Sequence, residues 1–292
     1  MRRLTGLVGV ACALALGTGC FEVKLGVSLQ PDGSVGVTES MWLTQGVIDL
    51  LWDIGHEDRA AGARFEAAHQ QMVSRFAAPT GEALDAMHAA GVRSLDRRVG
   101  ADHKQWGMEQ SAVYDSIDAL KTGWDAAHGS DGIPSDFIQL HVSCTPDRVC
   151  TLDYAQPARE PGENAGATPF DGLADAFKPE EEEDPKHKPS KREAKAAMER
   201  VSHMMEVMST EAANLKIGAT LTLPGEVLEP LPQGTTLSGQ TLSWGTDGAA
   251  MVAAAMGGAQ GAPPAPDMLP AGQVRFRLPD GAPIPADWLA AP

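Results

Sequence analysis

The chain has 292 residues, and its 39 acidic against 23 basic side chains give a formal net charge of −16. Binding to nucleic acid needs a basic face that meets the phosphate backbone, so this balance argues against nucleic acid as a partner. The length suffices for one well-packed domain or two small ones.

The amino terminus has the features of a secretory signal. Arg2 and Arg3 precede an apolar stretch, residues 4–16, that is too short to span a bilayer as a permanent helix. The stretch ends in Gly17-Thr18-Gly19-Cys20, and a cysteine directly after small residues resembles a bacterial lipobox, although Gly17 stands where a leucine is usual. We therefore expect residues 1–19 to be removed and Cys20 to be lipidated. The alternative is an ordinary signal peptide with a chance cysteine near its end.

Lipidation would place the body of the protein outside the cytoplasm. Each buried methylene contributes about 0.8 kcal/mol, so the two or more acyl chains of a processed lipoprotein cysteine hold a protein stably at a membrane. Residues 248–262 are also weakly polar, but they are mostly alanine and glycine and do not predict a span. Phe21 stands where, by resemblance to enterobacterial sorting, an aspartate would signal retention in the inner membrane. We expect a lipid-anchored body in the periplasm, at the outer membrane rather than the inner.

A β-hairpin is expected directly after the anchor. Residues 23–29 alternate between apolar and polar side chains, and the alternation resumes at Val35 and Val37. Between them, Pro31-Asp32-Gly33 predicts a tight turn, because proline suits its first central position and glycine the left-handed position that ends it. The hairpin would begin next to the lipid and hold the body close to the bilayer.

Helices and strands then alternate along the chain. Helical spacing predicts a long helical segment that breaks near Gly55, followed by shorter helices, and two strands lie between these. The expected helices cover residues 47–76, 82–90 and 116–127, and the expected strands cover residues 92–99 and 103–113.

Two cysteines remain once Cys12 leaves with the signal and Cys20 is lipidated. The flanking segments 137–144 and 150–154 alternate, and a three-residue loop between them would set Cys144 opposite Cys150, Val142 opposite Leu152 and Leu140 opposite Tyr154. Directly opposed strand positions lie close enough for a disulfide. We expect a structural Cys144–Cys150 disulfide rather than a redox pair, since the CxxC spacing is absent.

The chain changes character at residues 156–189. This stretch contains the acidic run 180–184 and few large apolar side chains, so its burial cannot offset the entropy of ordering. We expect a disordered acidic insertion there, and a helix over residues 191–214. Residues 257–292, rich in proline, glycine and alanine, are expected to be a flexible tail in which only Gln273–Leu278 has a strand pattern.

One resemblance to a known family comes from the two ends of the body. An alternating strand at 215–223 runs into Pro224-Gly225-Glu226-Val227, and Gly239-Gln240-Thr241-Leu242-Ser243-Trp244 follows a turn-rich stretch. With the anchored hairpin and its Asp32-Gly33 turn, this order resembles the LppM-like family of bacterial envelope lipoproteins, although that family's carboxyl-terminal membrane helix is missing here. The resemblance implies an α+β envelope domain that contacts lipid, and it gives no catalytic residue to carry over.

The patterns together predict one α+β domain over residues 20–256. Its core would be an antiparallel sheet built from hairpins, with several packed helices, interrupted by the insertion at 156–189.

The sequence contains none of the common catalytic motifs. GxSxG, a P-loop, GxGxxG after a strand and HExxH are all absent from the sequence. His69, His88 and His128 lie in helical stretches without a partner at ligand spacing, so we expect them at the surface rather than in a metal site. We therefore expect no catalytic residue, no cofactor, no metal site and no enzymatic activity.

Three roles outside catalysis remain open. The preferred one, which needs the fewest assumptions, is an interaction module that meets another envelope protein. The second is a protein that binds an acyl chain in a groove between the sheet and an apolar stripe formed by Met198, Val201, Met205 and Met208. The third is Cu(I) binding by these methionines with His203 and Met204, since thioether and imidazole ligands suit that ion. Against copper, methionine commonly fills gaps in apolar cores.

Overall fold

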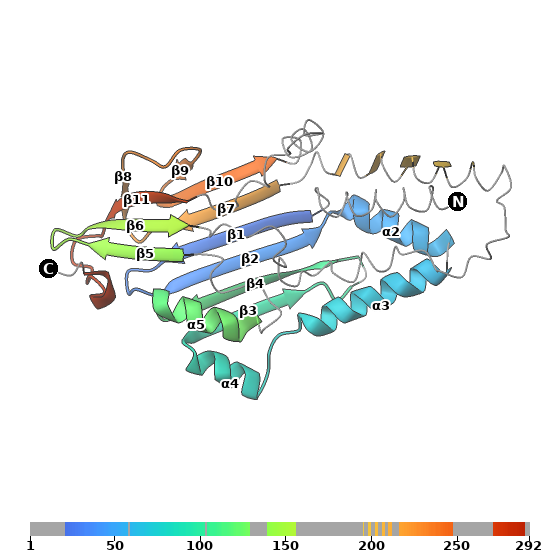
Figure 1. Cartoon of the computed structure of the whole chain (residues 1–292), viewed down its shortest axis with the longest axis horizontal. Helices are drawn as coiled ribbons and strands as arrows, with labels where there is room; N and C mark the ends of the chain where they lie inside the picture. Colours follow the sequence, from blue (N-terminus) through green and yellow to red (C-terminus); the bar gives the residue numbers. More distant parts are fainter. Residues whose placement is uncertain are drawn as a thin grey trace.

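The computed structural model describes residues 21–57, 59–102, 104–128, 139–155, 216–247 and 271–289, with single positions between 195 and 211. The signal peptide, Cys20, the acidic insertion and residues 257–270 of the expected tail lie outside the described residues. Within the described part, two β-sheets and a set of helices confirm the α+β class (Figure 1).

The larger sheet has seven strands in the order β3-β4-β2-β1-β7-β10-β9. Both expected hairpin strands and the two expected central strands are present in it. The strands are β1 (Phe21–Leu29), β2 (Val35–Leu43), β3 (Val92–Val99), β4 (Gly107–Tyr114), β7 (Lys216–Thr222), β9 (Thr236–Ser238) and β10 (Thr241–Asp247).

One pairing in this sheet differs from the all-antiparallel expectation. Strand β7 lies beside β1 in parallel, with Val23 opposite Ile217 and Ser28 opposite Thr222. Parallel neighbours need a long connection, and here most of the chain separates the two strands. The alternation of residues 215–223 predicts a strand but not its direction, so the sheet is mixed rather than antiparallel.

The second sheet is antiparallel, in the order β5-β6-β11-β8. Its strands are β5 (Gln139–Cys144), β6 (Val149–Ala155), β8 (Glu226–Leu228) and β11 (Gly272–Arg277).

Strand β11 corrects the expectation of a flexible tail over its last part. It confirms the strand pattern at Gln273–Leu278 and pairs with both β6 and β8. The short helix η2 (Ala286–Trp288) follows, and Trp288 is only 1% exposed. The proline, glycine and alanine around these residues led to the expectation of a flexible tail. A few large apolar side chains are nevertheless enough to bury this segment.

Two helices pack together as a hairpin and two others lie beside β3 and β4. The hairpin consists of α2 (Gln45–Glu57) and α3 (Arg59–Arg75), and the other two helices are α4 (Glu82–Ala89) and α5 (Ile117–His128). The break falls after Glu57, near Gly55 as expected, and Gly55 itself lies where the two helices come close together. A side chain on Gly62 would lie 2.7 Å from the Gly55 carbonyl oxygen.

Two apolar clusters hold these elements together. The main core lies between the two sheets and takes in α4 and α5, with Tyr114, Trp124, Phe276 and Trp288 among its largest side chains. The hairpin core joins α2 and α3 to the end of β2 and to the residue before β4. It consists of Leu43, Val47, Ile48, Leu51, Ala61, Phe65, Ala68 and Trp106.

A polar network on the core-facing side of the larger sheet separates the two cores. Gln110 in β4 donates from Nε2 to Glu39 Oε1 in β2 at 3.0 Å and accepts from Arg97 Nε in β3. Burial lowers the pKa of Arg97, and the nearby Glu39 carboxylate acts against that shift. The buried Gln110 therefore has a hydrogen-bond partner for both its amide nitrogen and its amide oxygen, supplied by the half-buried Glu39 and Arg97.

The other face of the larger sheet carries small polar side chains that are exposed or half-buried. We call it the open face, and it includes Ser28, Thr38, Ser40, Ser111, Thr220 and Ser243. The sheet also has two distinct ends. The anchor end is where β1 starts at Phe21 opposite Leu43, and the far end holds the Pro31–Gly33 turn. Figure 1 shows α2 and α3 projecting past the strands at the anchor end.

Candidate functional site

The anchor residue stands directly before the first strand. Cys20 itself lies outside the described residues, but β1 begins at Phe21, its neighbour in sequence. Register then places Leu43 and Trp42 of β2 opposite Phe21 and Glu22. Side chains at this end of the sheet are therefore paired with residues that directly follow the expected lipidated cysteine.

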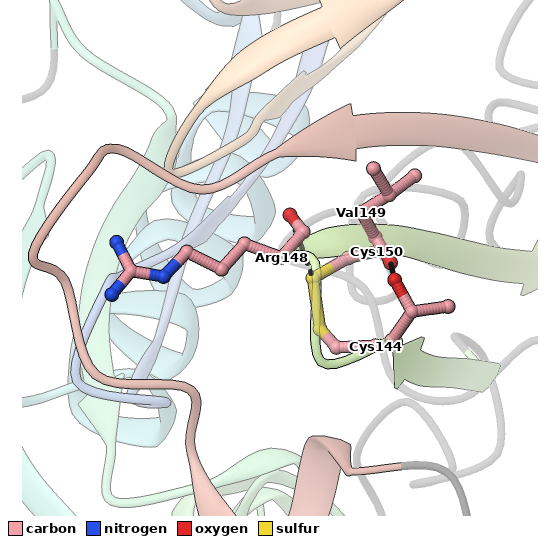
Figure 2. Close-up of a disulfide and its surroundings, with 5 residues drawn as sticks. Cys144, Arg148, Val149 and Cys150 are labelled. Carbon is pink, nitrogen blue, oxygen red and sulfur yellow. Dashed lines mark hydrogen bonds between the residues drawn. A yellow bond between two sulfur atoms is a disulfide. The ribbon is translucent and has the colours of Figure 1, made fainter.

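The expected disulfide is present in the β5–β6 hairpin (Figure 2). Cys144 faces Cys150 with an S–S distance of 2.02 Å, and Val142 faces Leu152, as the alternation predicts. Both cysteines are buried at the edge of the main core. Arg148, which ends the loop with φ 61°, extends away from the sulfurs and donates from Nη1 to the Pro279 carbonyl at 3.0 Å. The disulfide is a structural element at the far end, closing a hairpin that also contacts the chain after β11.

The methionine stripe is described at one of its positions. Met198 is 67% exposed, so it does not fill a core, and His203 is exposed as well. Val201, Met204, Met205 and Met208 lie outside the residues whose side chains are described. Across the described part of the chain, no group of three or more His, Cys, Asp or Glu side chains is arranged to hold a metal ion.

His69 differs from the expectation that the helical histidines are surface residues. It is 4% exposed, and its Nε2–H donates to the carbonyls of Gly100 at 2.9 Å and Gln105 at 3.2 Å. Its ring also packs on Trp106, with centroids 5.2 Å apart. His88 is exposed as expected. Spacing alone shows no partner for His69, because its partners are backbone carbonyls distant in sequence.

The loop that His69 holds lines a pocket at the anchor end. The pocket has a volume of about 270 Å³ and lies where β2, α2, β3 and the β3–β4 loop meet. Its lining residues are Trp42, Leu43, Gln45, Ile48, Arg98, Lys104, Gln105 and Trp106. Nothing in the sequence patterns marks these residues as a group, since two separate stretches of the chain, 42–48 and 98–106, supply them.

Backbone contacts explain why these segments meet. The Leu43 N–H donates to the Trp106 carbonyl at 2.8 Å, which ties the end of β2 to the loop. Gly107 follows with φ 148°, and a side chain there would lie 2.7 Å from Trp42 Cα. Because Gly107 has no side chain, Arg98 in the next strand reaches across the sheet toward Trp42.

Arg98 and Trp42 form the polar wall of the pocket. The guanidinium carbon lies 5.5 Å from the centre of the Trp42 ring, a cation–π geometry. Arg98 Nη2 also pairs with Glu109 Oε2 at 2.9 Å, although its side chain stays 71% exposed. The exposed Lys104 adds a second cation at the rim. Two cations beside an indole are suited to holding an anionic group such as a phosphate.

The fold and pocket describe an α+β protein with a Trp–Arg–Lys site, a half-buried indole beside two exposed cations, next to its expected anchor. No family model matches the chain, and no curated protein matches it. Among solved structures, it is similar to the folded domain of the Mycobacterium tuberculosis LppM protein, determined by NMR. The TM-score is 0.34 at 9% identity, and the match covers 90% of this chain and 93% of that chain.

No helix within the described ranges is long and apolar enough to cross a bilayer.

Proposed function

We propose that this chain is a lipid-anchored envelope protein that acts as a non-enzymatic interaction module in the periplasm. The observation that supports the proposal is the direct junction of the lipobox-like Gly17-Thr18-Gly19-Cys20 with β1, which begins at Phe21. An acyl anchor joined to a sheet strand without a linker limits the body to neighbours at the membrane surface. We further propose the outer membrane as its location, because Phe21 follows the anchor cysteine.

The anchoring part of this proposal is tested by substituting single cysteines. In the full chain expressed in bacteria, Cys20→Ala should move the protein from the membrane to the soluble fraction, while Cys12→Ala is the matched control within the signal and should leave it at the membrane. Metabolic labelling with a palmitate analogue should mark the wild-type protein and the Cys12→Ala variant. A Cys20→Ala protein that is processed normally and stays with the membrane would remove the anchor from the proposal.

The interaction part needs a second readout. Affinity capture of the acylated protein from envelope membranes should enrich a specific envelope component over a control lipoprotein carrying the same anchor. If every captured component is also present in that control, the body has no partner of its own and the interaction role is wrong.

The two alternative roles have less support. An acyl groove beside the methionine stripe would need its side chains turned toward the sheet, whereas Met198 is exposed. Copper binding would rest on Met204, Met205 and Met208, which lie outside the described residues.

A further inference from the structure

The pocket residues lie at the part of the body that the anchor holds against the membrane. Trp42 is opposite Glu22, two positions after Cys20, in the register of the first hairpin. Arg98 contacts Trp42 from β3, and Lys104 borders the same pocket from the loop. We call Trp42, Arg98 and Lys104 the anchor-end patch.

Charge singles out this patch in an acidic protein. The chain carries a net charge of −16, which repels anionic lipid headgroups over most of the surface. Around the anchor-end patch, Arg98 pairs with Glu109, and Lys24 pairs with Glu22 at 2.6 Å, so these carboxylates are balanced. Lys104 adds a positive charge at the pocket rim, and the Asp102 carboxylate, which accepts from the Lys104 backbone N–H at 3.0 Å, lies beside it. The patch is therefore a place where the body approaches phosphate without net repulsion.

The shape of the anchor end decides which side meets the bilayer. The 13-residue helix α2 is about 20 Å long and projects with α3 past the strand ends, so a bilayer cannot lie flat across them (Figure 1). The hairpin packs through Leu43, whose side chain points to the core-facing side of the sheet. Trp42, the preceding residue, points to the open face. If the body leans toward the open face, the hairpin clears the membrane and Trp42 moves to the level of the headgroups.

We infer that the anchor-end patch docks on the phosphates of phospholipid headgroups in the membrane that holds the anchor. Arg98 and Lys104 donate to phosphate oxygens, and Trp42 lies among the headgroups, where indole rings favour the membrane interface. The inference rests on the proposed anchoring at Cys20 and goes beyond it, because a tether alone requires no contact between the body and lipid.

The test uses the full-length acylated protein, purified from membranes and reconstituted into vesicles of phosphatidylethanolamine and phosphatidylglycerol. A small fraction of the lipids carries a nitroxide on the headgroup, which quenches tryptophans at that depth. We expect quenching of the wild-type protein and loss of most of it in Trp42→Phe. The matched control is Trp288→Phe, which removes a tryptophan packed near the far-end turn, and it should keep the quenching.

Charge variants test the role of phosphate. Arg98→Gln and Lys104→Gln should each weaken docking about fivefold, whereas Arg275→Gln, an exposed cation on β11, should leave it unchanged. Millimolar inorganic phosphate should not displace the patch from the vesicles.

The outcomes separate the inference from the proposed function. A protein that floats with the vesicles but shows the same quenching in Trp42→Phe as in wild type overturns the docking and leaves the anchor intact. Quenching that inorganic phosphate abolishes shows that the patch binds the free anion, and this also overturns the inference. A protein that fails to float overturns both.

Discussion

Single residues at the far end link three segments of the chain. The Asp32 carboxylate accepts from the Ser34 N–H at 3.0 Å and the Ser34 hydroxyl at 2.6 Å, and pairs with Arg93 at 3.0 Å. Arg93 also bonds Asp115 at 3.0 Å. Gly33, buried in the same turn with φ 87°, lies against Pro285 of the carboxyl-terminal segment. The turn that the sequence predicts for local reasons is thus also a tertiary contact.

Asp32 should make stability depend on pH in acid. Bonds from the Ser34 hydroxyl and N–H, and then Arg93, lower the pKa of Asp32 from 3.8 to about 2. A lowered folded-state pKa stabilises the fold above pH 4, and this contribution is lost as the pH falls from about 4 through about 2. Because the side chain is exposed, Asp32→Ala should cost about 1 kcal/mol or less at neutral pH and much less at pH 2. Urea unfolding across this range measures the difference, with Asp147→Ala, at the same position of the other Pro-Asp turn, as the control. A constant difference at every pH would contradict the assignment.

Among the residues around the candidate site, we expect substitution of His69 to lower the free energy of unfolding most. Its ring bonds two loop carbonyls and packs on Trp106, so His69→Ala leaves both a cavity and unpaired carbonyl groups. We expect a loss of about 2–4 kcal/mol in the free energy of unfolding. His88→Ala, at an exposed position of α4, should change it by about 0.5 kcal/mol or less. Equal effects of the two substitutions in urea unfolding would show that His69 does not hold the loop.

Among the elements, the hairpins are what the sequence predicts best, because local chemistry specifies them. Pro31-Asp32-Gly33 and Pro146-Asp147-Arg148 form the same three-residue loop, and in each the third residue has positive φ. Alternation on both sides then fixes the register of each pair. The parallel β1–β7 pairing and the position of β11 depend on which edge strands, distant in sequence, are available for pairing. No local sequence pattern predicts this.

The candidate pocket is beyond prediction from the sequence for the same reason. Its cations are ordinary surface residues in their own segments, and Gly107 brings Arg98 and Trp42 together only in the folded sheet. The disulfide, in contrast, can be predicted from the sequence, because both cysteines belong to one hairpin whose register the local alternation fixes.

The disulfide should contribute modestly to stability. It closes a loop with a sequence separation of 6, for which the chain-entropy model gives about 2 kcal/mol. The Cys144→Ala, Cys150→Ala double variant should therefore lose about that much in urea unfolding, plus a small packing loss at two buried positions. Adding reductant should destabilise the wild-type protein by a similar amount and leave the double variant unaffected. A reductant effect on the double variant would point to a different cause.

At the scale of the whole molecule, the two sheets share the main core. Tyr154 of β6 packs edge-on against Trp244 of β10, with ring centroids 5.4 Å apart. Gly272 makes this possible, since a side chain there would lie 2.7 Å from Tyr154 Cζ. Burial also raises the pKa of Tyr154 to about 12, so the ring stays neutral across the physiological range. The contact joins a strand from the middle of the chain to one from its second half, so the sheets should unfold together.

Phe276 tests this cooperativity from the carboxyl-terminal end. It lies opposite Cys150 in β6, is fully buried, and meets Trp288 edge-on with centroids 6.3 Å apart. Phe276→Ala should cost about 3–5 kcal/mol, whereas Arg275→Ala, on the exposed side of the same strand, should cost little. Hydrogen exchange then shows which strands lose stability in this variant. If the main core is one cooperative unit, amides of β1 and β7 should exchange faster in Phe276→Ala by the same factor as those of β6, because all of them open only by global unfolding. Faster exchange confined to β5, β6 and β11 would instead mean that the second sheet opens alone, and that the strand carrying the anchor is stable without it.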